Sequence, residues 1–144
     1  MSSIHFDELL QARQRIVGLV RQTPLEHSPS LSRLAGVPVW LKLESQQATG
    51  SFKLRGASNA VAQLDAEQKR LGVVTASTGN HGRALAFAAS QQGVKAIVCL
   101  SELVPQNKVR AIRELGAEVV ISGRSQDDAQ REALRIAREQ GAAF

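Results

Sequence analysis

The sequence predicts an α/β protein with an open parallel sheet and βαβ crossovers. After residue 37, short apolar runs alternate with helix-like segments, and glycine follows most of those segments. Hydrophobic residues make up 43% of the 144 residues and charged residues 22%, which suits a chain that buries a core. Because strands that alternate with helices are joined by right-handed crossovers, neighbouring strands are expected to be parallel.

The first 36 residues precede this alternation. Apolar residues at three- and four-residue steps predict an amphipathic helix over residues 6–20, which Thr23-Pro24 would stop. Residues 25–27 form a short segment before a small helix over residues 29–34. Ser28 is its expected N-cap and Gly36 its expected end.

The alternating part of the chain supplies the elements of the expected sheet. Strands are predicted over residues 37–43, 73–75, 96–100 and 119–121. Helices are predicted over residues 52–64, over a polar segment ended by Gly72, and over residues 81–92, 105–115 and 126–140. A further strand is expected to begin near Phe144.

The charge pattern argues against a nucleic-acid partner. The net charge is +5 and the pI is about 10.1, but basic residues are scattered among Asp and Glu. Aromatic residues make up only 3% of the chain, so no platform for base stacking is expected. No apolar segment reaches membrane-spanning length, and the charged N-terminus argues against a secretory signal.

Cys99 is the single cysteine and lies in an apolar run, where a buried core thiol is expected. One cysteine gives neither a disulfide framework nor zinc-ligand spacing, so a cytoplasmic location is expected. His5 and His27 each stand without a second ligand nearby in the sequence. We therefore expect no metal site.

Lys53 lies at the start of a predicted helix, where the helix macrodipole opposes a cation. A neutral amine is the form that attacks a carbonyl cofactor to give a Schiff base. Phe52 offers an apolar face to a flat ring, and Ser51 offers a hydroxyl. The stretch suggests a pyridoxal phosphate site, although an ordinary exposed helix lysine is the alternative.

A second polar stretch, residues 77–82, joins a predicted strand to the next helix. Its two hydroxyls, its glycines and Asn80 offer hydrogen-bond donors to an anion at a helix N-terminus. Ligands of parallel sheets bind at the carboxyl ends of the strands, so this loop and Lys53 are expected to face one ligand. The same residue types are preferred helix caps, so a plain capping loop is the alternative.

These two stretches resemble the signature segments of fold-type II pyridoxal-phosphate enzymes, in the threonine dehydratase and serine racemase family. The matching segments are Lys42-Leu43-Glu44, Thr49-Gly50-Ser51-Phe52-Lys53-Leu54-Arg55-Gly56-Ala57 and Ser77-Thr78-Gly79-Asn80-His81-Gly82. Residues 21–25, 104–108 and 116–119 also resemble family segments. Residues 76–86 are most similar to dehydratases linked to hydroxyectoine utilisation.

The resemblance implies a tryptophan-synthase-β-like fold. Residues 1–43 would form an N-terminal arm belonging to the larger cofactor domain. Residues 44–144 would form a small α/β domain that carries the lysine and the asparagine loop. The rest of the larger domain, with the phosphate cradle and the residue facing the pyridine nitrogen, has no counterpart in these 144 residues.

The resemblance also implies a role for each matched residue. Lys53 would form the Schiff base with pyridoxal 5'-phosphate and later take the substrate Cα proton. Phe52 would pack against the cofactor ring, and Asn80 would hydrogen-bond the ring hydroxyl. The pocket for the substrate carboxylate would consist of Ser77, Thr78, Gly79, Asn80 and His81.

The implied reaction is β-elimination, the dehydration and deamination of a hydroxy amino acid such as threonine or serine to a 2-oxo acid and ammonia. Thr78 lies where racemases of the family carry a serine, so racemisation is an alternative, and Arg83 lies where glutamine is common. A homodimer or higher homo-oligomer is implied. The 144 residues alone are expected to be inactive, and a non-catalytic anion-binding or interaction fragment is a further alternative.

Overall fold

The computed structural model describes residues 4–77 and 79–144. The helices are α1 (Phe6–Arg15), α2 (Pro29–Ala35), α3 (Lys53–Ala62), α4 (Ala66–Leu71), α5 (Asn80–Gln91), α6 (Gln106–Glu114) and α7 (Gln126–Gln140). The strands are β1 (Leu25–His27), β2 (Trp40–Lys42), β3 (Val73–Ala76), β4 (Ala96–Leu100) and β5 (Glu118–Ile121), and a 3-10 turn, η1, spans Glu44–Gln46.

Three strands form the predicted parallel sheet, in the order β3-β4-β5. Val73 lies opposite Ala96, and Ile97 lies opposite Glu118. Ala143 forms a parallel bridge with Val73 on the other side of β3, close to where a further strand was expected. The α/β fold class and the βαβ crossovers are therefore confirmed.

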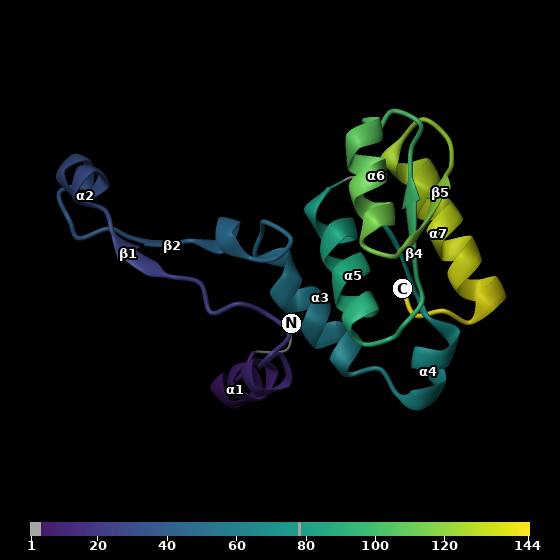
Figure 1. Ribbon diagram of the computed structural model, residues 1–144, viewed down its shortest axis with the longest axis horizontal. Helices are drawn as coiled ribbons and strands as arrows, with labels where there is room; N and C mark the ends of the chain where they lie inside the picture. The colour runs from purple at the N-terminus through teal and green to yellow at the C-terminus, as the bar shows by residue number, and fades with distance from the viewer. Residues whose placement is uncertain (1–3, 78) are drawn as a thin grey trace.

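Helices cover both faces of this sheet (Figure 1). Alternate residues of β4 face opposite sides, as the two-residue period of a strand requires. Val98 and Leu100 belong to the apolar cluster shared with α3, α5 and α6, whereas Ile97 and Cys99 pack against α7. Both sides of β4 are buried, which explains why its sequence is apolar throughout.

Small residues allow α3 and α5 to approach each other closely. Four alanines of α5 are buried: Ala84, Ala86, Ala88 and Ala89. Leu54 and Val61 of α3 are buried in the same cluster. This contact matters for the site because the candidate lysine begins α3 and the candidate anion loop leads into α5.

The N-terminal part differs from the prediction in two respects. The helix expected over residues 6–20 ends at Arg15, and Gly18 adopts a positive φ of 80°, which breaks the helical path. The strand expected over residues 37–43 is shortened to Trp40–Lys42 and pairs antiparallel with β1 in a separate two-stranded sheet. The connection between β1 and β2 consists only of α2 and its flanking residues. This short connection brings the chain back beside β1 in the opposite direction, so the two strands are antiparallel.

β1, α2 and β2 project away from the parallel sheet, while α1 lies beside α3 (Figure 1). The projecting segment exposes large apolar side chains, among them Leu34 and Trp40. The expected division into an arm of residues 1–43 and a small domain of residues 44–144 stays a prediction. Within residues 4–77 and 79–144, no helix has the length and apolar character needed to cross a bilayer.

Candidate functional site

Lys53 is the first residue of α3, as the sequence predicts, and its side chain is exposed. Its Nζ lies 5.2 Å from the centroid of the Phe52 ring, and 60% of Phe52 is exposed. Nζ donates no hydrogen bond to any residue of the described ranges. The amine thus lies over the Phe52 ring, and both groups are exposed at the surface.

The loop before Lys53 is packed into the protein. Gln47, Thr49 and Ser51 are each less than 8% exposed. The backbone amide of Lys53 donates to the Ser51 hydroxyl at 3.4 Å, and Leu54 is fully buried immediately after the lysine. Lys53 and Phe52 therefore project from a segment whose neighbouring residues are held on both sides.

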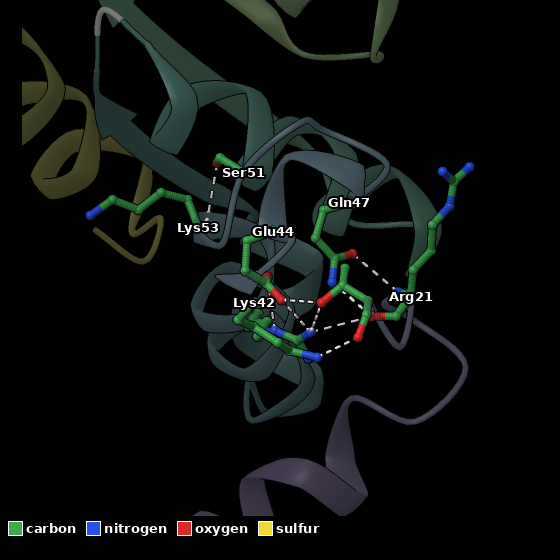
Figure 2. Close-up of polar contacts among 8 residues, drawn as sticks. Arg21, Lys42, Glu44, Gln47, Ser51 and Lys53 are labelled. Carbon is green, nitrogen blue, oxygen red and sulfur yellow. Dashed lines mark hydrogen bonds and ion pairs between the residues drawn. The ribbon is translucent and has the colours of Figure 1, made fainter. Parts of the chain in front are cut away.

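A half-buried ion pair joins this loop to α3. The Arg55 guanidinium donates to both carboxylate oxygens of Glu44, at 2.7 and 3.0 Å, and the Thr23 hydroxyl donates to Glu44 at 2.6 Å (Figure 2). The Arg55 hydrogen bonds are the largest cause that lowers the pKa of Glu44 to about 2. Sequence reasoning assigned no role to this pair, because a Glu and an Arg eleven positions apart form no local pattern.

Ser77 caps α5 from the end of β3. Its hydroxyl oxygen accepts hydrogen bonds from the backbone amides of Gly82, at 2.9 Å, and Gly79, at 3.4 Å. The hydroxyl proton remains for donation to a ligand. Thr78, predicted to serve the opposite face of the substrate, lies outside the described residues.

Gly82 is required by the close turn between Ser77 and α5. A Cβ at this position would lie 3.0 Å from the Ser77 carbonyl oxygen and 3.1 Å from Cγ1 of Val98. Those neighbours are backbone and a fully buried strand residue, so neither can move away easily. The glycine thus permits the loop to lie directly against the sheet.

Asn80 and His81 form the first turn of α5 and are exposed. Their backbone amides make no hydrogen bond to another described residue, as expected at a helix N-terminus. Such amides attract anions. The predicted carboxylate role of the loop has suitable donors, although the assignment itself stays a prediction.

The structure brings His81 close enough to Lys53 for their charges to interact. The pKa of His81 is lowered, first because neighbouring atoms desolvate the ring and second because of the Lys53 charge. His81 is exposed overall but also lines an apolar cavity of about 210 Å³ between α3, β3 and α5. His81 therefore links the start of α5 both to the charge of Lys53 and to this cavity.

These residues fit pyridoxal phosphate in two respects and its amino-acid substrate in a third. Lys53 has an amine without a hydrogen-bond partner among the described residues for the carbonyl carbon, Phe52 has an exposed ring for the pyridine face, and the start of α5 has amides for the substrate carboxylate. No cluster of three metal-ligating side chains occurs within the part of the chain that the structure describes. The chemistry available is that of an amine nucleophile at the start of α3 and of helix N-terminal amides, which favour anions, at the start of α5.

Residues 16–144 match the family model described as pyridoxal-phosphate dependent enzyme. The chain belongs to this family. The family match confirms the resemblance read from the sequence, the fold class and dependence on pyridoxal phosphate as a property of the family. The residue roles stay predictions.

Among curated relatives of this pyridoxal-phosphate family member, a putative threonine dehydratase of Sinorhizobium fredii is 53% identical over 141 residues. That alignment covers 98% of this chain and 42% of the relative. An L-threonine ammonia-lyase of Thermotoga maritima is 39% identical, with coverage of 98% and 35%. The chain thus spans less than half the length of these relatives.

Solved structures of the family agree with this fold. Maize serine racemase superposes with a TM-score of 0.92 at 34% identity, over 99% of this chain and 43% of that one. Threonine deaminase isoform 2 of Solanum lycopersicum gives a TM-score of 0.86 at 35% identity, over 99% and 43%. Both identities are high enough to support family membership as well as fold.

Proposed function

We propose that this chain supplies the lysine and the substrate loop of an ammonia-lyase that deaminates a hydroxy amino acid such as threonine or serine. The observation that carries the proposal is the packing of α3, which begins at Lys53, against α5, which begins with Asn80 and His81. The threonine dehydratase and threonine ammonia-lyase relatives support the choice of reaction.

In this proposal Lys53 holds the cofactor through Nζ, Phe52 lies against the cofactor ring, and Asn80 hydrogen-bonds the ring hydroxyl. When bound, pyridoxal phosphate supplies an electron sink for the substrate Cα. Lys53 would accept the Cα proton, because its amine is a base on a flexible four-carbon stem that can reach the substrate. The residues of this chain thus provide attachment, orientation and the base.

The loop before α5 would orient the substrate carboxylate. The amides of Asn80 and His81 and the Ser77 hydroxyl donate to its oxygens, and the capping bonds from Gly79 and Gly82 hold Ser77 in place. The lowered pKa of His81 favours the neutral ring near neutral pH, so it can donate a hydrogen bond without adding a second charge beside Lys53.

The overall reaction balances without an oxidant or reductant. The substrate loses its Cα proton and its β-hydroxyl as water. The released enamine becomes an imine, and hydrolysis of that imine gives a 2-oxo acid and ammonia. The base and the orienting groups required are the ones named above.

Reductive trapping tests the assignment of Lys53. Borohydride reduction in the presence of pyridoxal phosphate, followed by peptide mass mapping, should place the reduced cofactor on Lys53. Lys53→Arg should abolish this label because it keeps the charge and removes the nucleophile. Lys108→Arg is the matched control and should leave the label unchanged. Dominant label on Lys42, Lys69, Lys95 or Lys108 in the original chain would refute the assignment.

Racemisation is the second candidate function, favoured by the similarity to maize serine racemase and by the hydroxyl of Thr78. In the complete enzyme, Thr78→Ala should suppress racemisation of serine far more than elimination, because only racemisation requires a proton donor on the opposite face. Parallel assays of D-serine and 2-oxo acid formation measure both. Equal loss of the two activities would instead assign Thr78 to positioning.

A finer proposal concerns the physiological context. Residues 76–86 resemble dehydratases linked to hydroxyectoine utilisation, so a role in hydroxyectoine degradation is part of the proposal. A cytoplasmic homodimer or higher homo-oligomer completes it. Comparing the turnover of threonine, serine and intermediates of hydroxyectoine degradation by the complete enzyme tests the substrate assignment.

A further inference from the structure

We infer that Glu44 and Arg55 are positioning residues that fix the direction in which Lys53 leaves the start of α3. The inference rests on the proposed function, since it concerns the lysine that holds the cofactor. It assigns a purpose to a charged pair that touches neither the Lys53 amine nor the loop before α5.

The pair is built to resist movement. Two hydrogen bonds, at 2.7 and 3.0 Å, join the Arg55 guanidinium to both oxygens of Glu44, a geometry that fixes orientation as well as distance. Thr23 adds a third hydrogen bond to Glu44, at 2.6 Å. Only 18% of the Glu44 side chain and 33% of the Arg55 side chain are exposed, so water competes weakly for these contacts.

Arg55 follows Lys53 by two residues on the same helix, and Leu54 between them is fully buried. Glu44 lies at the start of the loop that leads to Lys53. Their contact therefore ties the beginning of this loop to the first turn of α3. Rotation of that turn about its axis would have to break the ion pair or expose Leu54.

The middle of the loop is also tied to the N-terminal segment. The Gln47 side chain accepts from the backbone amide of Arg21 at 3.1 Å and donates to the Arg21 carbonyl at 2.7 Å. Figure 2 shows this second attachment beside the first, and Lys53 extends away from Glu44 and Lys42. The cluster can thus act on Lys53 only through the backbone or through its charge.

Two single substitutions distinguish an effect on Lys53 through the backbone from an effect through charge. Glu44→Gln removes a negative charge beside Arg55, and Arg55→Gln removes a positive charge beside Glu44, which keeps Lys42 nearby. A charge effect on the Lys53 amine would have opposite signs in the two variants. A positioning effect would have the same sign in both, and the double variant would be no worse than either single variant.

The experiment measures borohydride trapping of pyridoxal phosphate on Lys53 relative to the summed label on Lys69, Lys95 and Lys108, because Lys42 lies beside Glu44 and would itself respond to the substitutions. This ratio isolates the geometry at Lys53, because a general loss of stability would not favour one lysine. We expect Glu44→Gln and Arg55→Gln each to lower the ratio about tenfold, since misplacing a reacting group by about 1 Å has effects of this order or larger.

The Glu67–Arg70 pair provides the matched control. It makes the same two-bond contact, at 2.6 and 2.9 Å, on the exposed surface of α4. Glu67→Gln should leave the labelling ratio unchanged. Arg55→Lys keeps the charge but not the two-bond geometry. If the position of Lys53 is what the pair controls, this variant should show most of the decrease in the labelling ratio that Arg55→Gln shows.

Two results would overturn the positioning role: changes of opposite sign in the labelling ratio of Glu44→Gln and Arg55→Gln, or an unchanged labelling ratio in both variants. Absence of selective Lys53 label in the original chain would instead contradict the proposed function. If circular dichroism shows that a charge variant is unfolded, Thr23→Val removes one contact to Glu44 without changing any charge. Thr23→Val should also lower the labelling ratio, and an unchanged ratio would overturn the inference.

Discussion

Replacement of Gly82 by alanine should destabilise the fold at the point where the candidate loop meets the sheet. The added Cβ would lie 3.0 Å from the Ser77 carbonyl oxygen and 3.1 Å from Cγ1 of Val98. Overpacking of this kind costs about 1 to 3 kcal/mol, and the higher helix propensity of alanine returns at most about 1 kcal/mol. The expected net loss in the free energy of unfolding is about 1 to 2 kcal/mol.

Gly56→Ala is the matched control because Gly56 is also a helical glycine, in α3. A Cβ there meets no heavy atom within 4 Å outside the adjoining helical backbone. The same chemical change should therefore stabilise the protein by about 0.5 to 1 kcal/mol through helix propensity alone. The two variants are expected to move stability in opposite directions.

Urea unfolding followed by far-UV circular dichroism measures both variants. For a chain of this size, a change of 1 kcal/mol also shifts the melting temperature by roughly 2 to 4 °C. If Gly82→Ala is as stable as Gly56→Ala, or more stable than the original chain, the close packing of this turn is not a constraint. The steric reasoning for the loop would then be wrong.

Two further predictions concern titratable groups. The depressed pKa of Glu44 means that its stabilisation is present above its ordinary value of 4.5 and is lost as the pH falls toward about 2. Glu44→Gln should therefore cost about 1 to 2 kcal/mol near neutral pH, after allowing for partial exposure, and progressively less in urea titrations at lower pH. An equal cost at every pH would contradict this. Burial raises the pKa of the Cys99 thiol to about 11, so a thiol reagent should modify Cys99 only when urea unfolds the chain, and rapid native labelling would contradict its burial.

Local sequence patterns were sufficient for most of the elements. The strand over residues 96–100 and the helix over residues 126–140 have the predicted bounds, because a continuous apolar run and a capped amphipathic segment are strong local signals. Ser28 caps α2 and Gly36 ends it in the left-handed conformation, as expected. Lys53 likewise begins its helix.

The partner strand of β2 could not be predicted from local sequence patterns. Its apolar residues resemble those of the parallel strands, yet it pairs with β1 in a separate sheet. A strand pattern records which side chains can be buried but does not identify the partner strand. The choice depends on how the short connection through α2 folds back, which is a property of the whole segment.

The sequence by itself determined the fold class, the family and the identity of the candidate lysine and loop, because each depends on residue type and local spacing. The tertiary structure decided which of these residues meet. The effect of Lys53 on the pKa of His81 and the Glu44–Arg55 contact both require α3 to pack beside its neighbours. Such contacts join residues distant in sequence, and their energies depend on burial and orientation that arise only when the chain has folded.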